Sequence, residues 1–451
     1  MWAEDGMRKV LMIAYFFPPM GGSGVQRTLK FAKYLPNFGW QPIILTVSNP
    51  SLHEADYSLL EELPGDLPVY RTLDFNLPHL LRRTARRLGF ISSNVRHSEK
   101  IVSASPQPSP PAKSKLRAAL SSFADTWLWT PDQFIYWLPS ALWVGLKIVK
   151  QCDVIYSTAD PFTDHLVACF LHKLSGKPWV ADFRDPWTQY VIYQRWSSRL
   201  RSRVDAFFEK HILDIPDMIS VTCAATGKSF QETYPSLPKD KFIEITNGFD
   251  AEDFDQPDGS HFDTFTIAYT GRFHGKKNDS PSFLRALKEL RREHPELASE
   301  IRILFAGIFG EQNHALLKQW DLEEMVKPLE YVPHHESIKL LLQSHVLLLT
   351  LNDEPGVNLT YPGKLFEYLA ARKTILALVS EGATADMIRD MEAGLVVPPD
   401  DTETIKKAIL DLYNQYQQGN LATKTYDDLQ KFERRTLTER LAQCLDAVLQ
   451  K

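Results

Sequence analysis

The chain lacks most of the features that mark secreted and membrane-spanning proteins. Its 451 residues include four cysteines, which stand far apart in the sequence. This spacing excludes a C-x-x-C zinc site and provides no disulfide framework. No apolar run approaches the roughly 18 residues that cross a bilayer, and the first residues have neither the basic stretch nor the long apolar core of a secretion signal. We therefore expect a cytoplasmic protein.

Positive charge is not in surplus either. The net charge of −5 argues against a nucleic-acid binder, and a hydrophobic content of 44% argues against a disordered chain. The basic residues are concentrated in one stretch, because residues 80–120 contain nine lysines and arginines against one acidic residue, Glu99. A basic island on an acidic chain predicts contact with one anionic surface.

The glycine motifs of two common nucleotide-binding loops are missing. An apolar run at 10–17 breaks at two prolines into Gly-Gly-Ser-Gly at 21–24, and a helical pattern begins near Val25. This loop matches neither G-x-G-x-x-G nor the P-loop, which weakens a dehydrogenase or P-loop NTPase interpretation. Glycine still lets backbone amides approach an anion, so Gly22 and Gly24 are candidate phosphate contacts. An ordinary turn is the alternative.

What the chain does contain is a regular alternation of strand-like apolar runs and helical patterns, which is typical of parallel α/β domains. The acidic, turn-rich stretch at 250–263 cannot build a core and predicts a linker. We predict an N-terminal domain at 1–252, a C-terminal domain at 262–430 and a last helix within 431–451, with packing of that helix on the first domain as one arrangement. The expected strands lie at 10–17, 42–47, 154–157, 179–182, 218–222, 264–269, 301–306, 346–351, 375–379 and 394–397.

Residues 77–137 have the composition of an insertion in the first domain. They contain a leucine stripe with four arginines, a low-complexity stretch at 103–115 and an aromatic-rich segment. A basic amphipathic helix beside an aromatic platform suits anionic lipid headgroups. A solvated arginine face with ordinary core tryptophans is the alternative.

Cations and a carboxylate follow strand ends in the second half. Arg272 and Lys277 stand five residues apart after the strand at 264–269, which lets both reach one diphosphate. Gly363 and Lys364 open a later helix whose amides can hold phosphate. Glu367, in the first turns of that helix, can accept two ribose hydroxyls.

Two polar motifs follow strands of the first half. His165 opens a helix after the strand at 154–157, where it can donate to a sugar oxygen or else pack in the core. Asp182, Arg184 and Asp185 follow the next strand. Because unpaired buried charges are costly, we expect these three to pair with one another and to line a cleft.

Together these motifs resemble those of a bacterial family 4 glycosyltransferase of the GT-B fold. The resemblance rests on Phe-Pro-Pro with Gly-Gly-Ser-Gly-Val-Gln-Arg, then Ala-Asp-Phe-Arg-Asp-Pro-Trp, Thr-Asn-Gly-Phe-Asp, Gly-Arg followed by Lys, and Lys-Leu-Phe-Glu-Tyr-Leu-Ala. It covers most of the chain outside the insertion. It implies two Rossmann-like domains facing across a cleft, a nucleotide-sugar donor held mainly by the second, an acceptor on the first, and retention of anomeric configuration. A cell-envelope glycan or a lipid-linked molecule is then the expected acceptor, with docking on the inner face of the cytoplasmic membrane as one interpretation of the insertion.

The resemblance also assigns roles to individual residues. Arg272 and Lys277 match the catalytic pair that clamps the donor diphosphate, and Glu367 matches the ribose ligand. Val332 lies in the segment whose backbone reads the base. His165 resembles the histidine near the donor sugar, and the loop at 22–24 resembles the one bordering the β-phosphate. The resemblance implies no metal or other cofactor. It also implies no enzymic nucleophile, because in retaining enzymes of this fold the leaving diphosphate is thought to accept the acceptor's proton.

One position departs from the family pattern. Leu359 stands where the family usually has a first glutamate that contacts the transferred sugar. Candidate replacements are Asp353, Glu354 and Asn358. The string Asp-Phe-Asp at 253–255 fits the metal motif of the other major transferase fold, but it lies in the linker, and we interpret it as chance. A nucleotide-sugar 2-epimerase of the same fold and a non-catalytic glycan- or nucleotide-binding module remain as alternatives.

Overall fold

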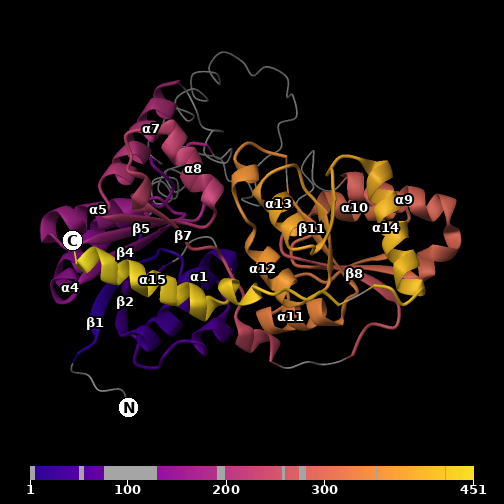
Figure 1. Cartoon of the computed structure of the whole chain (residues 1–451), viewed down its shortest axis with the longest axis horizontal. Helices are drawn as coiled ribbons and strands as arrows, with labels where there is room; N and C mark the ends of the chain where they lie inside the picture. Colours follow the sequence, from indigo (N-terminus) through magenta and orange to yellow (C-terminus); the bar gives the residue numbers. More distant parts are fainter. Residues whose placement is uncertain are drawn as a thin grey trace, which may run out of the picture.

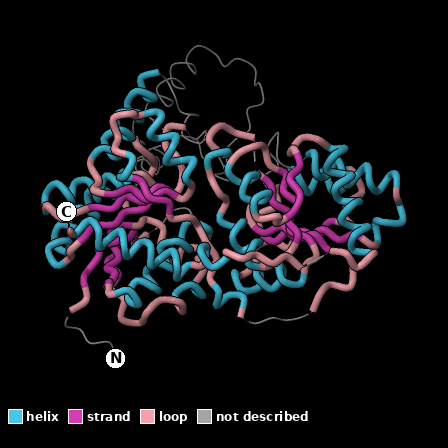
Figure 2. The backbone as a smooth tube through the Cα atoms, viewed as in Figure 1, coloured by secondary structure: helices cyan, strands magenta, loops and turns pink. Residues whose placement is uncertain are grey.

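The computed structural model describes residues 6–49, 55–75, 130–189, 199–255, 260–273, 281–351, 353–421 and 423–450. Two parallel sheets, one in each half of the chain, form its framework (Figure 1). Helices surround both sheets (Figure 2). The predicted parallel α/β architecture with two domains is therefore confirmed.

The N-terminal sheet has the strand order β3-β2-β1-β4-β5-β6-β7, with every neighbouring pair parallel. Its central strands are buried on both faces, as a sheet covered by helices on both sides requires. The strands are β1 (Arg8–Ile13), β2 (Trp40–Val47), β3 (Val69–Thr72), β4 (Val154–Ala159), β5 (Trp179–Phe183), β6 (Met218–Val221) and β7 (Phe242–Glu244). The helices are α1 (Ser23–Tyr34), α4 (Leu138–Ile148), α5 (Thr163–Ser175), α7 (Arg199–Asp214) and α8 (Ala224–Thr233).

The C-terminal sheet has the order β10-β9-β8-β11-β12-β13 and is also parallel throughout. Its strands are β8 (Phe265–Thr270), β9 (Ile301–Ala306), β10 (Val326–Pro328), β11 (Val346–Thr350), β12 (Thr374–Leu378) and β13 (Gly394–Val397). Its helices are α9 (Pro281–Glu293), α10 (Glu311–Gln319), α11 (His334–Gln343), α12 (Gly363–Ala370), α13 (Ala383–Asp390) and α14 (Thr402–Gln417). In open parallel sheets, ligands bind beyond the carboxyl ends of the strands.

The last helix, α15 (Arg434–Leu449), lies on the N-terminal domain beside α1 (Figure 1). Leu437, Leu441 and Leu445 share a buried core with Met12 of β1 and Phe31 of α1. The chain therefore passes between the domains twice. Hydrogen bonds join the two passages, because the Phe249 amide donates to the Phe432 carbonyl at 3.1 Å and the Arg434 amide donates to the Phe249 carbonyl at 2.8 Å.

Most of the proposed insertion, including its arginines, lies outside the described residues. Of the aromatic segment, Trp137 is fully buried and its Nε1 donates to Thr72 Oγ1 at 2.7 Å, so the core interpretation is right for this residue. Trp143 on α4 is exposed, with Lys147 Nζ 3.6 Å from its ring centroid. None of the helices in the described ranges is long and apolar enough to cross a bilayer.

Candidate functional site

Two glycines bring the loops after β8 and β9 into contact. Gly307 has φ +124°, and a Cβ on it would stand 2.2 Å from the carbonyl oxygen of Gly271. Gly271 itself has φ +113°. Residues with a side chain rarely adopt such φ angles, and the close approach of the two backbones leaves no space for a side chain at position 307. The result is a bare backbone surface at the carboxyl edge of the C-terminal sheet.

Two cations border this surface. Arg272 is exposed directly after β8, and its carbonyl oxygen accepts a hydrogen bond from the Tyr269 hydroxyl at 2.8 Å. Lys364 reaches the same place from α12, with Nζ 3.8 Å from the Tyr269 ring centroid and 3.3 Å from a Cβ built on Gly271. The structure thus brings together Arg272 and Lys364. Lys277 lies outside the described residues, so its role stays a prediction.

The N-terminus of α12 adds backbone donors. This helix begins at Gly363, and its N-cap residue, Pro362, provides no side-chain cap. The first amides of a helix have no partner within the helix, and they carry the positive end of its dipole. The Gly363 and Lys364 amides therefore suit an anion beside the Lys364 ammonium.

Gly271 and Gly363, which both lie at this sheet edge, allow a matched test of the local geometry. Gly271→Ala should lower the free energy of unfolding by about 1–2 kcal/mol, because an alanine at positive φ is strained and its methyl meets Lys364. Gly363→Ala should be neutral or stabilising by up to about 1 kcal/mol, because its Cβ meets open space and alanine favours a helix. Thermal unfolding of both variants checks this, and equal melting temperatures would contradict the described loop geometry.

Glu367 does not stand alone. Its Oε1 accepts a hydrogen bond from Nε2 of His334, the first residue of α11, at 3.2 Å. Burial lowers the pKa of His334, but the hydrogen bond to Glu367 and the charges of Glu367 and Asp253 outweigh it and raise that pKa to about 9. Sequence reasoning missed His334, although its place directly after the Tyr-Val-Pro segment was an available signal.

The segment predicted to read a base leads into α11 and touches the other domain. Val332 is partly buried, and Tyr331 before it is exposed. The Tyr331 hydroxyl donates to Asp56 Oδ2 of the N-terminal domain at 2.8 Å. This segment therefore bridges the two domains next to Glu367.

In the N-terminal domain, one arginine connects the glycine loop to a strand end. Gly22 has φ +100° and precedes α1. Arg184 donates to the carbonyl oxygens of Gly24 at 2.7 Å, Ala159 at 3.0 Å and Asp160. The loop is thus held at the carboxyl edge of the sheet by contacts with backbone.

The expected mutual pairing of Asp182, Arg184 and Asp185 is wrong for Asp182. Asp182 lies inside β5, fully buried, and pairs with Arg27 of α1 at 2.7 Å. Arg184 follows the end of β5, and its guanidinium donates to backbone carbonyl oxygens at the sheet edge. The charge of Asp182 is therefore satisfied in the core and does not line the cleft.

His165 is sealed from solvent. Its exposure is zero, its Nδ1 lies 2.8 Å from Ser157 Oγ, and its ring lies 4.5 Å from that of Phe183. Burial lowers its pKa to about 3, so the ring is neutral. Its Nε2 is buried and has no hydrogen-bond partner among the described residues. The packing interpretation describes this conformation, and contact with a sugar oxygen would require the covering groups to move.

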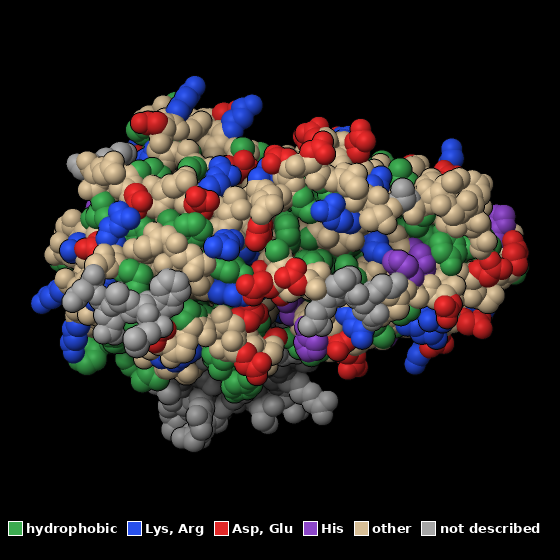
Figure 3. Space-filling view, turned by 60° about the horizontal axis from the view of Figure 1, so that its bottom comes forward, with side chains coloured by type: hydrophobic (Ala, Val, Ile, Leu, Met, Phe, Trp, Pro, Cys, Tyr) green, Lys and Arg blue, Asp and Glu red, His purple; other side chains and the backbone are tan. Residues whose placement is uncertain are grey.

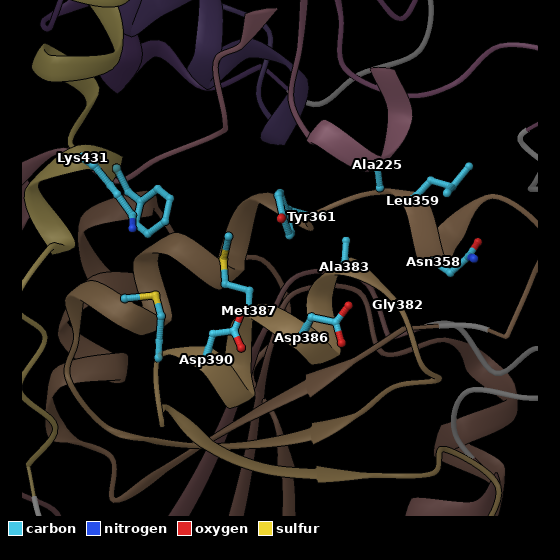
Figure 4. A pocket seen from close by; sticks show the side chains of 12 residues that line it. Ala225, Asn358, Leu359, Tyr361, Gly382, Ala383, Asp386, Met387, Asp390 and Lys431 are labelled. Carbon is cyan, nitrogen blue, oxygen red and sulfur yellow. The ribbon is translucent and has the colours of Figure 1, made fainter. Parts of the chain in front are cut away.

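Two cavities flank the loop that contains Leu359, the residue that differs from the family pattern. One of about 480 Å³ is lined by Leu359, by Ala225 of α8 and by residues of α13 (Figure 4). The other, of about 390 Å³, lies beyond β11 and β12. It brings together the three candidate replacements for the first glutamate, Asp353, Glu354 and Asn358. Leu359 is held between the domains, because its carbonyl oxygen accepts from Thr226 Oγ1 at 2.7 Å.

The linker motif at 253–255 has ionic partners within the protein. Asp253 Oδ2 lies 3.9 Å from Lys30 Nζ and 3.9 Å from His334 Nδ1. Within the described ranges, no three histidine, cysteine or acidic residues are grouped as metal ligands would be.

The C-terminal half matches a protein family in sequence, and the whole chain matches solved structures. Residues 264–415 match the family described as glycosyl transferases group 1. No curated protein matches the chain in sequence. The structure is similar to Anabaena HepE in complex with UDP-glucose, with TM-score 0.64, 14% identity and coverage of 97% of this chain and 99% of that chain.

Two further solved structures are similar over almost the whole chain. Sucrose-phosphate synthase from Thermosynechococcus elongatus gives TM-score 0.58 at 13% identity, covering 98% of this chain and 96% of its own. A putative UDP-N-acetylglucosamine 2-epimerase from Listeria monocytogenes gives 0.54 at 11% identity, covering 98% and 97%. The two domains have the GT-B fold. The group 1 domain together with this fold supports a glycosyltransferase.

Proposed function

We propose that the protein is a retaining glycosyltransferase of the family 4 type, which transfers a hexose from a UDP-sugar to a cell-envelope glycan or a lipid-linked acceptor. The observation that carries the proposal is the meeting, at one sheet edge, of Arg272, Lys364, the uncapped start of α12 and Glu367. Two cations and the amides at the start of a helix suit a diphosphate, and a carboxylate one helical turn further on suits the ribose that follows it. The UDP-glucose complex of HepE supports UDP as the carrier.

In the proposed reaction, the bond between C1 of the sugar and the diphosphate oxygen breaks. The acceptor oxygen bonds to C1 from the same face, and its proton moves to the leaving diphosphate. Negative charge grows on the diphosphate, so Arg272, Lys364 and the amides stabilise the transition state more than the ground state. Lys277 is proposed to add to this charge. Gly22 and Gly24 would border the β-phosphate from the other domain. This route requires neither a protein nucleophile nor a metal.

The donor sugar is proposed to lie against the 390 Å³ cavity beyond β11 and β12. Asp353 is held there by a hydrogen bond from Ser380 Oγ to its Oδ1 at 2.9 Å. Carboxylate oxygens accept sugar hydroxyls well. Asp353, with Asn358 on the same rim, is thus proposed to take over from the glutamate that Leu359 replaces. Docking on an anionic membrane through the basic stretch stays a prediction.

A donor screen tests this function. The full-length protein is incubated with UDP-glucose, UDP-N-acetylglucosamine or GDP-mannose, and release of the nucleoside diphosphate is measured with and without excess chelator. We expect slow release from at least one UDP-sugar that survives the chelator. If the chelator abolished the release of nucleoside diphosphate and a divalent metal restored it, the metal-free route would be contradicted. A C2-epimerised UDP-sugar would establish the epimerase alternative, and nucleotide binding without turnover would favour a binding module.

A further inference from the structure

His334 is placed between two carboxylates that come from different parts of the chain. Its Nε2 lies 3.2 Å from Glu367 Oε1 on α12, and its Nδ1 lies 3.9 Å from Asp253 Oδ2. Asp253 belongs to the short 3-10 helix Ala251–Phe254 in the linker. A carboxylate at each ring nitrogen favours the doubly protonated imidazolium, which has a donor on both sides.

The same line of charges continues into the N-terminal domain. Asp253 Oδ2 lies 3.9 Å from Lys30 Nζ of α1. Lys30 is buried, and its Nζ pairs with Asp250 Oδ2 at 2.6 Å and with Glu62. Charged side chains therefore run from α12 through α11 and the linker to α1. Acidic, basic and histidine side chains gather between the two halves of the molecule in Figure 3.

Two further charged groups border this line. Burial raises the pKa of Asp56, but hydrogen bonds from Ser58 and Tyr331, together with the charge of His334, outweigh it and lower that pKa. Arg434, at the start of α15, is buried and interacts electrostatically with Glu367, Asp250 and Asp253. Within the part of the chain that the structure describes, Nη1 of Arg434 has no hydrogen-bond partner. The groups that face His334 or its partners are Glu367, Asp253, Asp56, Lys30, Asp250, Glu62 and Arg434.

A carboxylate that accepts two ribose hydroxyls has to hold its plane in one orientation. Glu367 is about one quarter exposed, and rotation about its last side-chain bond is otherwise nearly free. The bond from His334 fixes Oε1 and leaves Oε2 to accept from the ligand side. We propose that His334 is a positioning residue of the donor site, which orients Glu367 for the ribose and ties that carboxylate to the interdomain linker through Asp253. The inference rests on the proposed function, because it takes Glu367 as the ribose ligand.

A double-mutant cycle on the full-length protein tests this inference. Binding of UDP is measured by calorimetry for wild type, His334→Ala, Glu367→Ala and the double variant. A hydrogen bond to a charged group is worth about a factor of 10 in affinity, so His334→Ala should raise the Kd about tenfold and Glu367→Ala at least as much. The double variant should bind no more weakly than Glu367→Ala, because His334 acts through Glu367. If the affinity losses of the two single variants multiply in the double variant, His334 acts independently of Glu367, and the inference is overturned.

Two control variants separate positioning from folding. His334→Gln keeps a neutral donor and should recover most of the affinity lost in His334→Ala. His335→Ala removes the exposed neighbouring histidine, which pairs with Glu336, and should bind UDP as wild type does. All variants should retain the wild-type melting temperature within a few degrees. Equal loss in His334→Gln and His335→Ala would mean that α11 as a whole had been disturbed, which contradicts the specific role.

A nucleotide-free readout keeps this inference distinct from the proposed function. Imidazole NMR signals of the free protein should give His334 a pKa near 9, and Glu367→Gln should lower that value by about one unit. An ordinary value near 6.5 in wild type would overturn the arrangement. Failure of wild type to bind UDP would refute the proposed function and the ribose role together. Binding that depends on Glu367 but not on His334 would refute the positioning role alone.

Discussion

Arg272→Ala is expected to lower the rate of donor turnover about 100-fold, because it removes a full positive charge from the place where a leaving diphosphate gains negative charge. The fold should not change. The Arg272 side chain is exposed, and the hydrogen bond from Tyr269 ends on the backbone carbonyl, which alanine retains. Nucleoside diphosphate release under saturating donor measures the effect.

Arg302→Ala provides the matched control for this substitution. Arg302 is an exposed arginine on the neighbouring strand β9, near the amino end, opposite the proposed site. It should leave turnover unchanged. If Arg272→Ala retained activity within about threefold of wild type, the diphosphate would have to bind elsewhere.

The largest effect on stability is expected from Asp182→Ala, which should lower the free energy of unfolding by about 3–5 kcal/mol. Asp182 accepts from Arg27 through both carboxylate oxygens, at 2.7 and 2.8 Å, and from the hydroxyls of Tyr156, Thr158 and Ser220. Its removal leaves the Arg27 guanidinium charged and buried without a counterion. Urea unfolding measures the loss.

The double variant Arg27→Met/Asp182→Leu should be more stable than Asp182→Ala, because it leaves no isolated buried charge. Acid sensitivity provides a second check. Burial raises the pKa of Asp182, but Arg27 and the hydroxyl donors outweigh it and lower that pKa to about 2. The folded pKa is below the unfolded one, so the contribution is present above about pH 4 and is lost as pH falls toward 2. An Asp182→Ala protein as stable as wild type at neutral pH would contradict this account of the core.

Central strands could be predicted from the sequence, whereas most edge strands could not. The strands β4, β8 and β12 are buried on both faces, and most of their residues are apolar. The missed strands β3, β7 and β10 lie at the sheet edges, contain three or four residues and are at most partly covered. Such segments carry little apolar pattern, because their backbone is held by one neighbour and most of their side chains are at least partly exposed.

The candidate site shows the same division. Arg272, Lys364 and Glu367 follow predicted strand ends or open a predicted helix, so their local context indicated where they would lie. The approach of Gly307 to Gly271 and the contact of His334 with Glu367 join elements far apart in the sequence. Spacing along the chain does not encode such contacts. Asp182 was misassigned because alternation within β5 turns its side chain toward α1, where Arg27 stands.

The return of α15 to the first domain affects the order of events during synthesis. Domains generally fold as they leave the ribosome, beginning with the first. Here the apolar face around Met12 and Phe31 is covered by Leu437, Leu441 and Leu445, which are made only after the whole C-terminal sheet. The N-terminal domain is therefore completed only after the C-terminal domain has been translated. A nascent chain would expose this face until α15 has been made, which gives a chaperone a defined surface to bind and makes the loss of α15 a defect of the N-terminal core.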